Sequence, residues 1–288
     1  MATGPAKTAV EPMSIVAMDQ YEQHPLVQDE LAHHFLPPTA RAMAAVARWP
    51  KLREVIRSAT EHKFPGLWAS MLCRKRYFDD AVTEAVSSGC ETVIILGAGL
   101  DDRAYRLPAL ADIPVFEVDL PRNITEKYQR LHALFCSVPK TTTLVPVDFE
   151  RQNLAEVLGD YGYRADRPTY FLWEAVTQYL TERDVRRTFD FLGTAPVGSR
   201  LGFTYVRSDF LSGQNLYDAR EAHRQFVTKS HLWRFGMSPD TVTDFLTEYG
   251  WHKTEDLGAT EFNDRYLEPA HRRLPLTQIE RAVSAEKR

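Results

Sequence analysis

Cysteine is scarce in this chain of 288 residues, which holds only three. They are Cys73, Cys90 and Cys136, and no two of them have the spacing of a CxxC pair. The absence of such a pair excludes the usual cysteine-based zinc and redox motifs. The odd number of cysteines argues against a framework of disulfides. A reducing compartment, the cytoplasm, is therefore the expected location.

Long apolar runs and an excess of charge of one sign are also missing. No stretch approaches the roughly 20 apolar residues that span a membrane, and the first residues have no apolar core typical of a signal peptide. The 35 Lys and Arg against 39 Asp and Glu give a formal net charge of −4, so no positive field draws the protein to nucleic acid or membranes. We expect neither as a partner, we assign residues 1–12 to a mobile tail, and the oligomeric state stays open.

Short apolar runs alternate with helical segments through the middle of the sequence. Strands are expected at 92–96, 114–118, 142–147, 169–173 and 200–206. Helices are expected between them, for example at 123–135 and 181–192. Because strands that alternate with helices form parallel sheets covered on both faces, the pattern predicts an α/β fold.

The segments around this alternation indicate how the chain is organised. Residues 13–89 have helical spacing and would cap a Rossmann-like core at 90–207. Residues 208–250 are rich in aromatics and would form a helical insertion over the acceptor, a lid. Residues 251–288 would add two strands, at 251–257 and near 281–285, completing a mostly parallel sheet of about seven strands.

The most informative stretch is TVIILGAGLDDRAYR at 92–106, in which branched apolar residues end in Gly97-Ala98-Gly99. Glycines at the carboxyl end of a buried parallel strand let the backbone turn sharply and approach a ligand. A nicotinamide-binding turn has a third glycine where this sequence has Asp102. An acid there lies poorly beside a diphosphate, which favours a cofactor without phosphates, such as S-adenosylmethionine.

Acidic residues at three further strand ends could contact such a cofactor. Glu117 and Asp119 face the same side of the second strand and could accept from ribose hydroxyls, or else form an ion pair with a nearby arginine. Asp148 could reach the adenine amino group or cap a loop. Glu174 could accept from an ammonium group or stabilise the sulfonium, or else complement a helix N-terminus.

Four motifs, in this order, resemble those of the leucine carboxyl methyltransferase family, a branch of the class I S-adenosylmethionine-dependent methyltransferases. They are RKRYFD at 74–79, VIILGAGLDDRAYRL at 93–107, FEVDLP at 116–121 and WEAVTQYL at 173–180, where Ala175 replaces a common glycine. The resemblance implies a class I methyltransferase fold with S-adenosylmethionine as the methyl donor.

The residues and the resemblance together propose a cofactor site made of Arg74, Gly97, Ala98, Gly99, Asp101, Arg103, Glu117, Asp119, Asp148, Phe149 and Glu174. By the resemblance, Arg74 would bind the cofactor carboxylate, which suits a guanidinium fork; otherwise it belongs to a solvated basic cluster. Asp119 would hold the ribose, Asp148 and Phe149 would flank the adenine, and the glycines would admit the methionine moiety. Tyr179 would border the acceptor, unless it is simply a core residue.

The chemistry of the acceptor decides which further groups are needed. A carboxylate is already ionised at neutral pH, so its methylation requires neither a base nor a metal, and the sequence has no clustered metal-ligand motif. It would benefit from a cation, for which Arg207 and Arg234 are candidates. A phenol or alcohol would instead require a base, for which His223 or His231 is available.

The aromatic insertion suits a planar, apolar small molecule. Residues 233–237 and 245–251 resemble the bacterial, polyketide-tailoring carboxyl methyltransferases of the family. We therefore expect an O-methyltransferase that acts on a small aromatic or polyketide-like acid. The alternatives are methylation of a hydroxyl, methylation of a protein C-terminus, a nicotinamide-dependent oxidoreductase, and a non-catalytic protein that binds S-adenosylmethionine.

Overall fold

Strand β1 (Thr92–Leu96) contributes side chains to two of the three hydrophobic cores of the described chain. In this computed structural model, which describes residues 9–149 and 151–288, Val93 and Ile95 belong to one core and Ile94 and Leu96 to the other. Successive side chains of a strand point to opposite faces, and all five residues of β1 are buried. The strand is therefore covered on both sides, as expected for a parallel sheet between helices.

The remaining strands are β2 (Val115–Asp119), β3 (Thr142–Pro146), β4 (Thr169–Trp173), β5 (Arg200–Val206), β6 (Trp251–Leu257) and β7 (Glu280–Lys287). The α-helices are α1 (Val10–Asp19), α2 (Ala32–Phe35), α3 (Pro38–Val46), α4 (Pro50–Lys63), α5 (Leu67–Ser87), α6 (Arg103–Arg106), α7 (Pro121–Phe135), α8 (Leu154–Asp160), α9 (Glu182–Gly193), α10 (Ser208–Leu211), α11 (Arg220–Ala222), α12 (Val242–Glu248) and α13 (Ala259–Phe262). Two π-helices, His223–Lys229 and Asn263–Leu267, follow α11 and α13.

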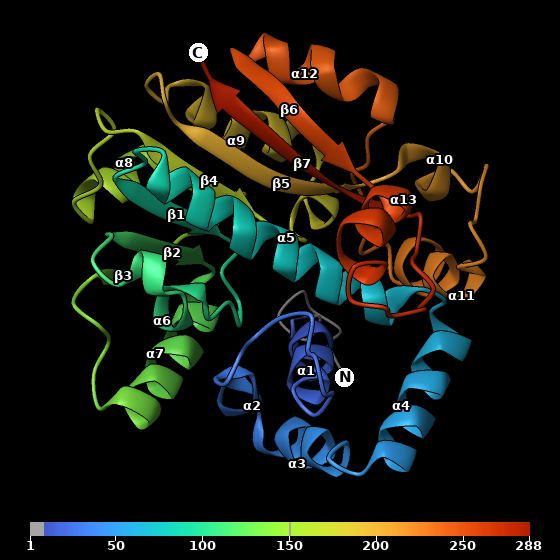
Figure 1. Cartoon of the computed structure of the whole chain (residues 1–288). Coiled ribbons are helices and arrows are strands. Elements are labelled where there is room, and N and C mark those ends of the chain that lie inside the picture. Colours follow the sequence, from blue (N-terminus) through green and yellow to red (C-terminus); the bar gives the residue numbers. More distant parts are fainter. Residues whose placement is uncertain (1–8, 150) are drawn as a thin grey trace.

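The seven strands form one sheet in the order β3-β2-β1-β4-β5-β7-β6 (Figure 1). Strand β1 pairs in parallel with β2 and β4, whereas β7 runs antiparallel to both of its neighbours. The order of strands reverses between β1 and β4. In open α/β sheets, ligands bind beyond the carboxyl ends of the strands at this point.

Helices cover both faces of the sheet. Helix α5 lies across the front in Figure 1, and its Leu72 packs into the core that contains Val93. On the other face Leu158 of α8, Phe189 of α9 and Leu246 of α12 pack into the second core. This layering holds the carboxyl ends of the strands in position as the base of a site.

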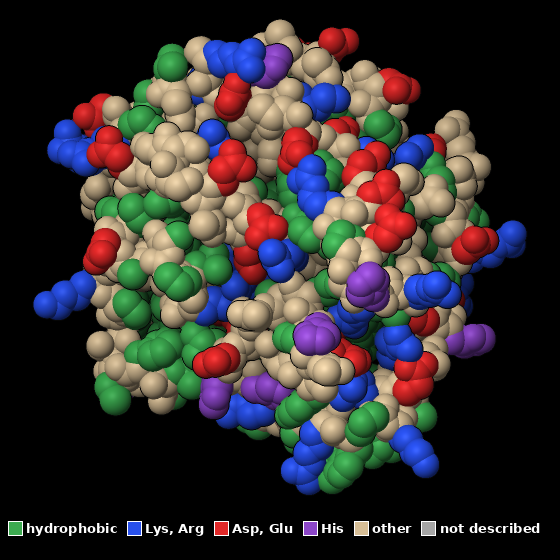
Figure 2. Space-filling model, viewed as in Figure 1, with side chains coloured by type: hydrophobic (Ala, Val, Ile, Leu, Met, Phe, Trp, Pro, Cys, Tyr) green, Lys and Arg blue, Asp and Glu red, His purple; other side chains and the backbone are tan. Residues whose placement is uncertain are grey.

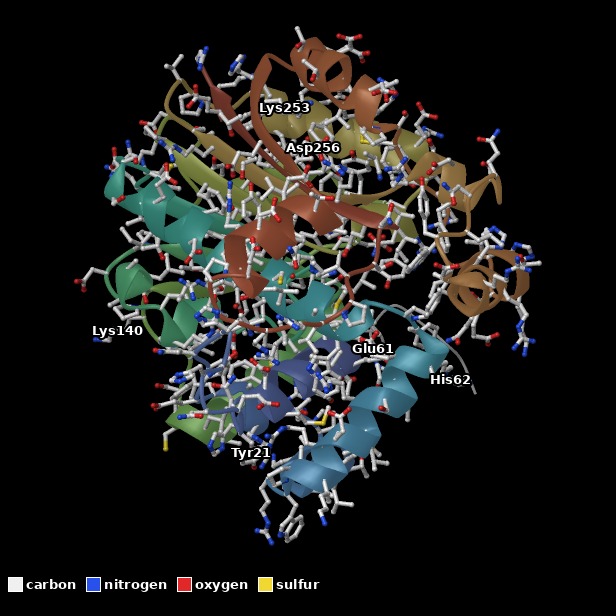
Figure 3. All side chains as sticks on the ribbon, turned by 45° about the vertical axis from the view of Figure 1, so that its right-hand side comes forward. Tyr21, Glu61, His62, Lys140, Lys253 and Asp256 are labelled. Carbon is white, nitrogen blue, oxygen red and sulfur yellow. The ribbon has the colours of Figure 1, made fainter. Side chains whose placement is uncertain are left out.

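The start of α5, which leads to that site, is positioned by Glu61 at the end of α4 (Figure 3). Its carboxylate accepts from the backbone N–H groups of Gly66 and Trp68, at 2.6 and 3.0 Å. Gly66 has a φ of +77°, and a Cβ there would lie 2.2 Å from the backbone nitrogen of Thr277. The chain therefore needs glycine at this turn.

All seven expected strands are observed. Those at 92–96, 169–173, 200–206 and 251–257 have the predicted bounds, and the other three differ by a few residues at their ends. Of the expected mobile tail, residues 1–8 lie outside the described residues. Residues 10–12 form the first turn of α1, so that part of the prediction is wrong. Helix α1 is ordered because it buries Ile15 and Val16 in the first core.

The expected lid at 208–250 contains less regular helix than predicted. It has two short helices, α10 and α11, a π-helix at His223–Lys229, and α12 near its end. Its aromatic residues pack in small groups rather than along one helical face; for example, Phe210 contacts Trp233 with ring centroids 6.1 Å apart. Whether this segment moves as a lid stays a prediction.

The surface shows no segregation of charge on the face viewed in Figure 2, where acidic and basic side chains are interspersed. This mixture agrees with the small net charge of −4. None of the helices in the described part of the chain combines the length and apolar character that crossing a bilayer requires.

Candidate functional site

A cavity of about 530 Å³ lies at the carboxyl ends of β1, β2 and β4, where the strand order reverses. Its walls come from α1, α5, the loops after these strands, and the segment 219–234. A volume of this size is within the range of about 300–1,000 Å³ that is usual for small-molecule sites. The fold thus places the glycine motif in the wall of a cavity of this size.

The turn after β1 lines this cavity with Gly97, Ala98 and Gly99. Gly97 has a φ of +72°, and a Cβ there would lie 2.4 Å from Cγ2 of Val176. The backbone N–H of Gly99 donates to Oδ2 of Asp119 at 2.6 Å. A side chain at Gly97 would therefore collide with Val176. The hydrogen bond from Gly99 holds the turn against the end of β2.

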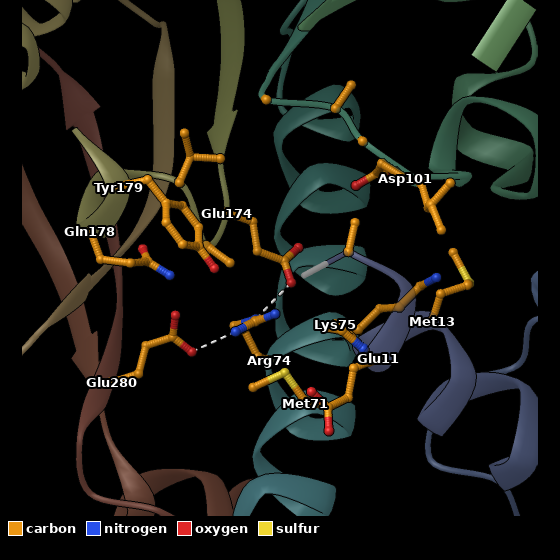
Figure 4. A pocket seen from close by; sticks show the side chains of 18 of the residues that line it. Glu11, Met13, Met71, Arg74, Lys75, Asp101, Glu174, Gln178, Tyr179 and Glu280 are labelled. Carbon is orange, nitrogen blue, oxygen red and sulfur yellow. Dashed lines mark hydrogen bonds and ion pairs between the residues drawn. The ribbon is translucent and has the colours of Figure 1, made fainter. Parts of the chain in front are cut away.

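Arg74 lies in the cavity wall between two carboxylates (Figure 4). Its Nε is 2.7 Å from Oε1 of Glu174, and its Nη1 is 2.5 Å from Oε2 of Glu280. Burial alone would lower the pKa of Arg74, but Glu280 and Glu174 outweigh burial and raise it. The residue is 5% exposed, so the alternative of a solvated basic cluster is wrong.

Glu174 is shared by two arginines. Besides Arg74, it contacts Nη1 of Arg103 with its Oε2 at 2.9 Å. Burial would raise the pKa of Glu174, but Arg103 and Arg74 lower it to about 2. Arg103 also pairs with Asp101 and, at 2.7 Å, with Asp79. The acid at the end of β4 is therefore held ionised at the cavity surface.

Asp102, which occupies the third glycine position, does not line the cavity. It is fully buried, and its Oδ1 lies 2.9 Å from both Lys75 and Arg106. Burial would raise the pKa of Asp102, but these two cations hold it well below its usual range. The acid thus binds the turn to α5 and α6 instead of facing a ligand.

The two acids of β2 have different surroundings. Asp119 lines the cavity and accepts from the N–H of Leu120 and from Nδ2 of Asn123, both at 2.7 Å. Glu117 is fully buried and does not line the cavity. It lies 2.8 Å from Nζ of Lys127 and accepts from the hydroxyl of Tyr105 at 2.6 Å.

The prediction that Glu117 belongs to the cofactor site is therefore wrong. Glu117 does form an ion pair, but with Lys127 and not with an arginine, as the alternative expected. Two residues along a strand share a face but are separated by about 6.6 Å along its axis. Glu117 consequently lies below the edge of the sheet that Asp119 reaches. Burial raises the pKa of Glu117 to about 7, although Lys127 lowers it.

Asp148 and Phe149 follow β3 and line the cavity beside the glycine turn. Phe149 is buried, and Asp148 is partly exposed. The N–H of Asp148 donates to Oε1 of Gln152 at 2.9 Å. Both residues therefore line the candidate cofactor cavity, and their contact with an adenine stays a prediction.

Some of the groups expected at the acceptor line the cavity, and one lies outside it. Tyr179 lines the cavity, and so does Arg234, whose Nε donates to the carbonyl of Tyr179 at 2.9 Å. Arg207 does not line it, so its predicted catalytic role is wrong: its guanidinium pairs with Asp209 at 3.1 Å. Val206 faces the cavity, and the next residue of an extended chain points the other way.

Neither His223 nor His231 is among the residues that line the cavity. His223 packs edge-on against Phe210, with ring centroids 5.4 Å apart. His231 is exposed and has a φ of +50°. The two histidines are therefore not positioned as bases for an acceptor in this cavity.

Sequence reasoning missed several residues of the cavity wall, namely Glu11, Met13, Met71, Gln178 and Glu280. Glu280 is the first residue of β7 and is separated from Arg74 by 206 positions. An acid at the start of a strand carries no local signal for such a contact. Gln178 lies inside the motif WEAVTQYL, in which the resemblance gives a role to its neighbour Tyr179 and none to Gln178.

Comparison with solved structures supports the fold. A proposed methyltransferase from Thermobifida fusca superposes with a TM-score of 0.56 and 14% identity, covering 95% of this chain and 94% of that one. A duf574 family protein from Streptomyces avermitilis gives a TM-score of 0.56 and 15% identity, covering 96% and 97%. The predicted α/β fold with a seven-stranded, mostly parallel sheet is thus confirmed.

Sequence comparison identifies the family. A proposed S-adenosyl-L-methionine-dependent methyltransferase from Mycolicibacterium smegmatis is 33% identical over 193 residues, which are 65% of this chain and 62% of that relative. Another from Mycobacterium avium is 30% identical over 223 residues, 74% of this chain and 71% of that one. The match therefore spans slightly under two thirds of the first relative's length. Residues 9–193 match the model of leucine carboxyl methyltransferases, and the chain belongs to this family.

Proposed function

We propose that this protein binds S-adenosylmethionine and transfers its methyl group to an oxygen atom of a small, apolar acceptor. The observation that carries the proposal is the meeting of the glycine turn, Asp119, Glu174 and Arg74 in one cavity. Family membership and the names of the mycobacterial relatives support it.

The charges of these residues match the charges of the cofactor. Asp119 offers carboxylate oxygens to ribose hydroxyls, Glu174 offers them to the ammonium group, and Arg74 offers a guanidinium fork to the carboxylate. Gly97 and Gly99 leave room where side chains would otherwise fill the turn. When bound, the cofactor supplies an electrophilic methyl group on a sulfonium. The protein has to hold the acceptor oxygen in line with that group and exclude water.

The rest of the cavity suits an apolar acceptor, because its walls include Met13, Phe64, Met71, Phe226 and Trp233. We infer a carboxylate as the first candidate for the methyl-accepting group, as the family resemblance implies. A carboxylate is ionised at neutral pH and needs no base. A small aromatic or polyketide-like acid remains the proposed substrate class.

A hydroxyl acceptor is the second candidate, and Glu11 in the cavity wall is the observation that favours it. Of the two cations expected to serve a carboxylate, Arg207 lies outside the cavity and Arg234 lines it. The acids Glu11 and Glu280 line it too, and Glu280 is paired with Arg74. Glu11 is exposed, but partial shielding of its carboxyl from water raises its pKa, which Lys63 lowers. A carboxylate with a raised pKa is suited to accept a proton from an alcohol or phenol.

Calorimetric titration with S-adenosylmethionine, S-adenosylhomocysteine, NAD and NADP tests the proposal. We expect binding of the two adenosyl ligands only; binding of a nicotinamide cofactor and of neither adenosyl ligand would contradict it.

The acceptor group is tested by the stability of the incorporated methyl group. Loss in base indicates an ester, and retention indicates an ether.

A further inference from the structure

Three aromatic rings form a ladder along one wall of the cavity. Phe64 stacks on Phe226 with centroids 6.0 Å apart, and Phe226 stacks on Trp233 at 4.8 Å with an angle of 12° between the rings. All three residues line the cavity. The backbone N–H of Trp233 donates to the carbonyl of Phe226 at 3.1 Å, which holds the last two rings together. Aromatic faces arranged in this way favour a flat ligand.

The same wall contains two polar atoms that the described residues leave without a hydrogen-bond partner. Gln178 is 4% exposed, and its Oε1 is buried without a donor. Nε1 of Trp233 is buried without an acceptor. Figure 4 shows the amide of Gln178 directed into the pocket, between Tyr179 and Glu280. Buried polar atoms are nearly always paired, so each exception calls for an explanation.

The two unpaired atoms come from neighbouring segments. The backbone N–H of Arg234 donates to the carbonyl of Gln178 at 2.7 Å, and that of Phe235 donates to it at 3.4 Å. The segment carrying Trp233 therefore runs beside the segment carrying Gln178. Just before it lies the π-helix His223–Lys229, which contains Phe226. π-Helical turns are frequent at functional sites.

We propose that Gln178 and Trp233 recognise a hydroxylated aromatic acceptor. A hydroxyl group of the ligand donates to Oε1 of Gln178, and a ligand oxygen accepts from the N–H of the Trp233 indole. The flat ring lies against the ladder of Phe64, Phe226 and Trp233. A ligand of this class satisfies both buried atoms, whereas a purely aliphatic or unsubstituted aromatic ligand leaves them unpaired. The inference rests on the proposed function, because it assigns this molecule as the methyl acceptor.

Two small probes test the recognition without turnover. Binding of 2-naphthol and of 2-methoxynaphthalene is measured by calorimetry, with and without S-adenosylhomocysteine. The ether keeps the ring and the oxygen but has no hydrogen to donate. We expect the natural protein to bind 2-naphthol about tenfold more tightly, which corresponds to about 1.4 kcal/mol and matches one net hydrogen bond.

Two variants separate the two contacts. Gln178→Leu should reduce the preference for 2-naphthol to about twofold or less, because only the hydroxyl contact is lost. Trp233→Phe keeps a ring in the ladder and should weaken both probes by a similar factor, leaving the preference intact. Gln214→Leu, at an exposed position outside the cavity, serves as the matched control and should change neither.

The outcomes are distinct. A preference that persists in Gln178→Leu overturns the inference, and so does failure of both probes to bind at millimolar concentration. Unaltered binding of S-adenosylhomocysteine in each variant shows that the fold is retained. If the natural protein prefers 2-naphthol but does not bind S-adenosylhomocysteine, the proposed methyl transfer fails while the recognition of hydroxylated aromatics stands.

Discussion

Arg74 and Glu174 form an ion pair across one hundred positions of the sequence, with 2.7 Å between Nε and Oε1. The arginine comes from α5 and the acid from the end of β4, and Arg74 also pairs with Glu280. Charges held in a buried network are ionised and oriented before any ligand arrives, so removing one of them leaves its partners uncompensated. Loss of either charge should therefore disturb the candidate cofactor site.

Replacing Arg74 should weaken cofactor binding. We expect Arg74→Ala to reduce the affinity for S-adenosylmethionine by about 1–3 kcal/mol, the usual cost of losing a charged partner, measured by calorimetry. Arg76→Ala is the control, because Arg76 lies on the same helix but pairs with Asp80, with about half of its side chain exposed. Unchanged affinity in folded Arg74→Ala would refute the assigned role.

The two acids of β2 should respond differently. Asp119→Ala should weaken binding of S-adenosylmethionine by about 1–3 kcal/mol, since Asp119 lines the cavity. Glu117→Gln should leave the affinity nearly unchanged while lowering the free energy of unfolding, because Lys127 loses its buried partner. An equal loss of affinity in the two variants would show that Glu117 contacts the cofactor after all.

The pKa of Glu117 predicts a pH dependence of stability. It is about 7 in the folded protein, against an ordinary value of 4.5. Between these values the folded state binds more protons than the unfolded state, so stability falls as pH rises. The unfolding free energy of the natural protein minus that of Glu117→Gln should therefore decrease as the pH rises from about 4.5 to 7. Urea denaturation at several pH values measures it, and a constant difference would contradict the assignment.

Glu174 should give the opposite trend. Its pKa is held at about 2, below the ordinary value of 4.5, by Arg103 and Arg74 against the effect of burial. The stability that it contributes is present above pH 4.5 and is lost as pH falls towards 2. The advantage of the natural protein over Glu174→Gln should therefore shrink on acidification, as followed by denaturant unfolding. An advantage that does not depend on pH would contradict the ion-pair assignment.

Replacing Gly97 tests whether the turn after β1 requires glycine. An alanine there would have to adopt a φ of +72° with its Cβ 2.4 Å from Val176, and a left-handed conformation costs about 1–2 kcal/mol by itself. We expect Gly97→Ala to lower the melting temperature and to abolish binding of S-adenosylhomocysteine. Gly159→Ala is the matched control: it lies in α8 with open space around it, and it should stabilise the helix by up to about 1 kcal/mol. Normal binding by Gly97→Ala would show that the turn does not need glycine.

The errors in the sequence reasoning have simple geometric causes. Alternation along β2 correctly placed Glu117 and Asp119 on one face, but it contains no information about depth below the edge of the sheet. Arg207 was expected at the acceptor because it follows β5. A shift of one residue reverses the side of a strand, and it is Val206 that faces the cavity.

By itself, the sequence determined the strands, the glycine turn and the order of the motifs, because periodicity and backbone freedom are properties of neighbouring residues. Only the tertiary structure decided which side chains meet. Strand β7 inserts antiparallel beside β5 and brings Glu280 to Arg74, and the segment after α11 lays Trp233 beside Gln178. Such contacts depend on strand order and on the packing of distant segments, which no local pattern encodes.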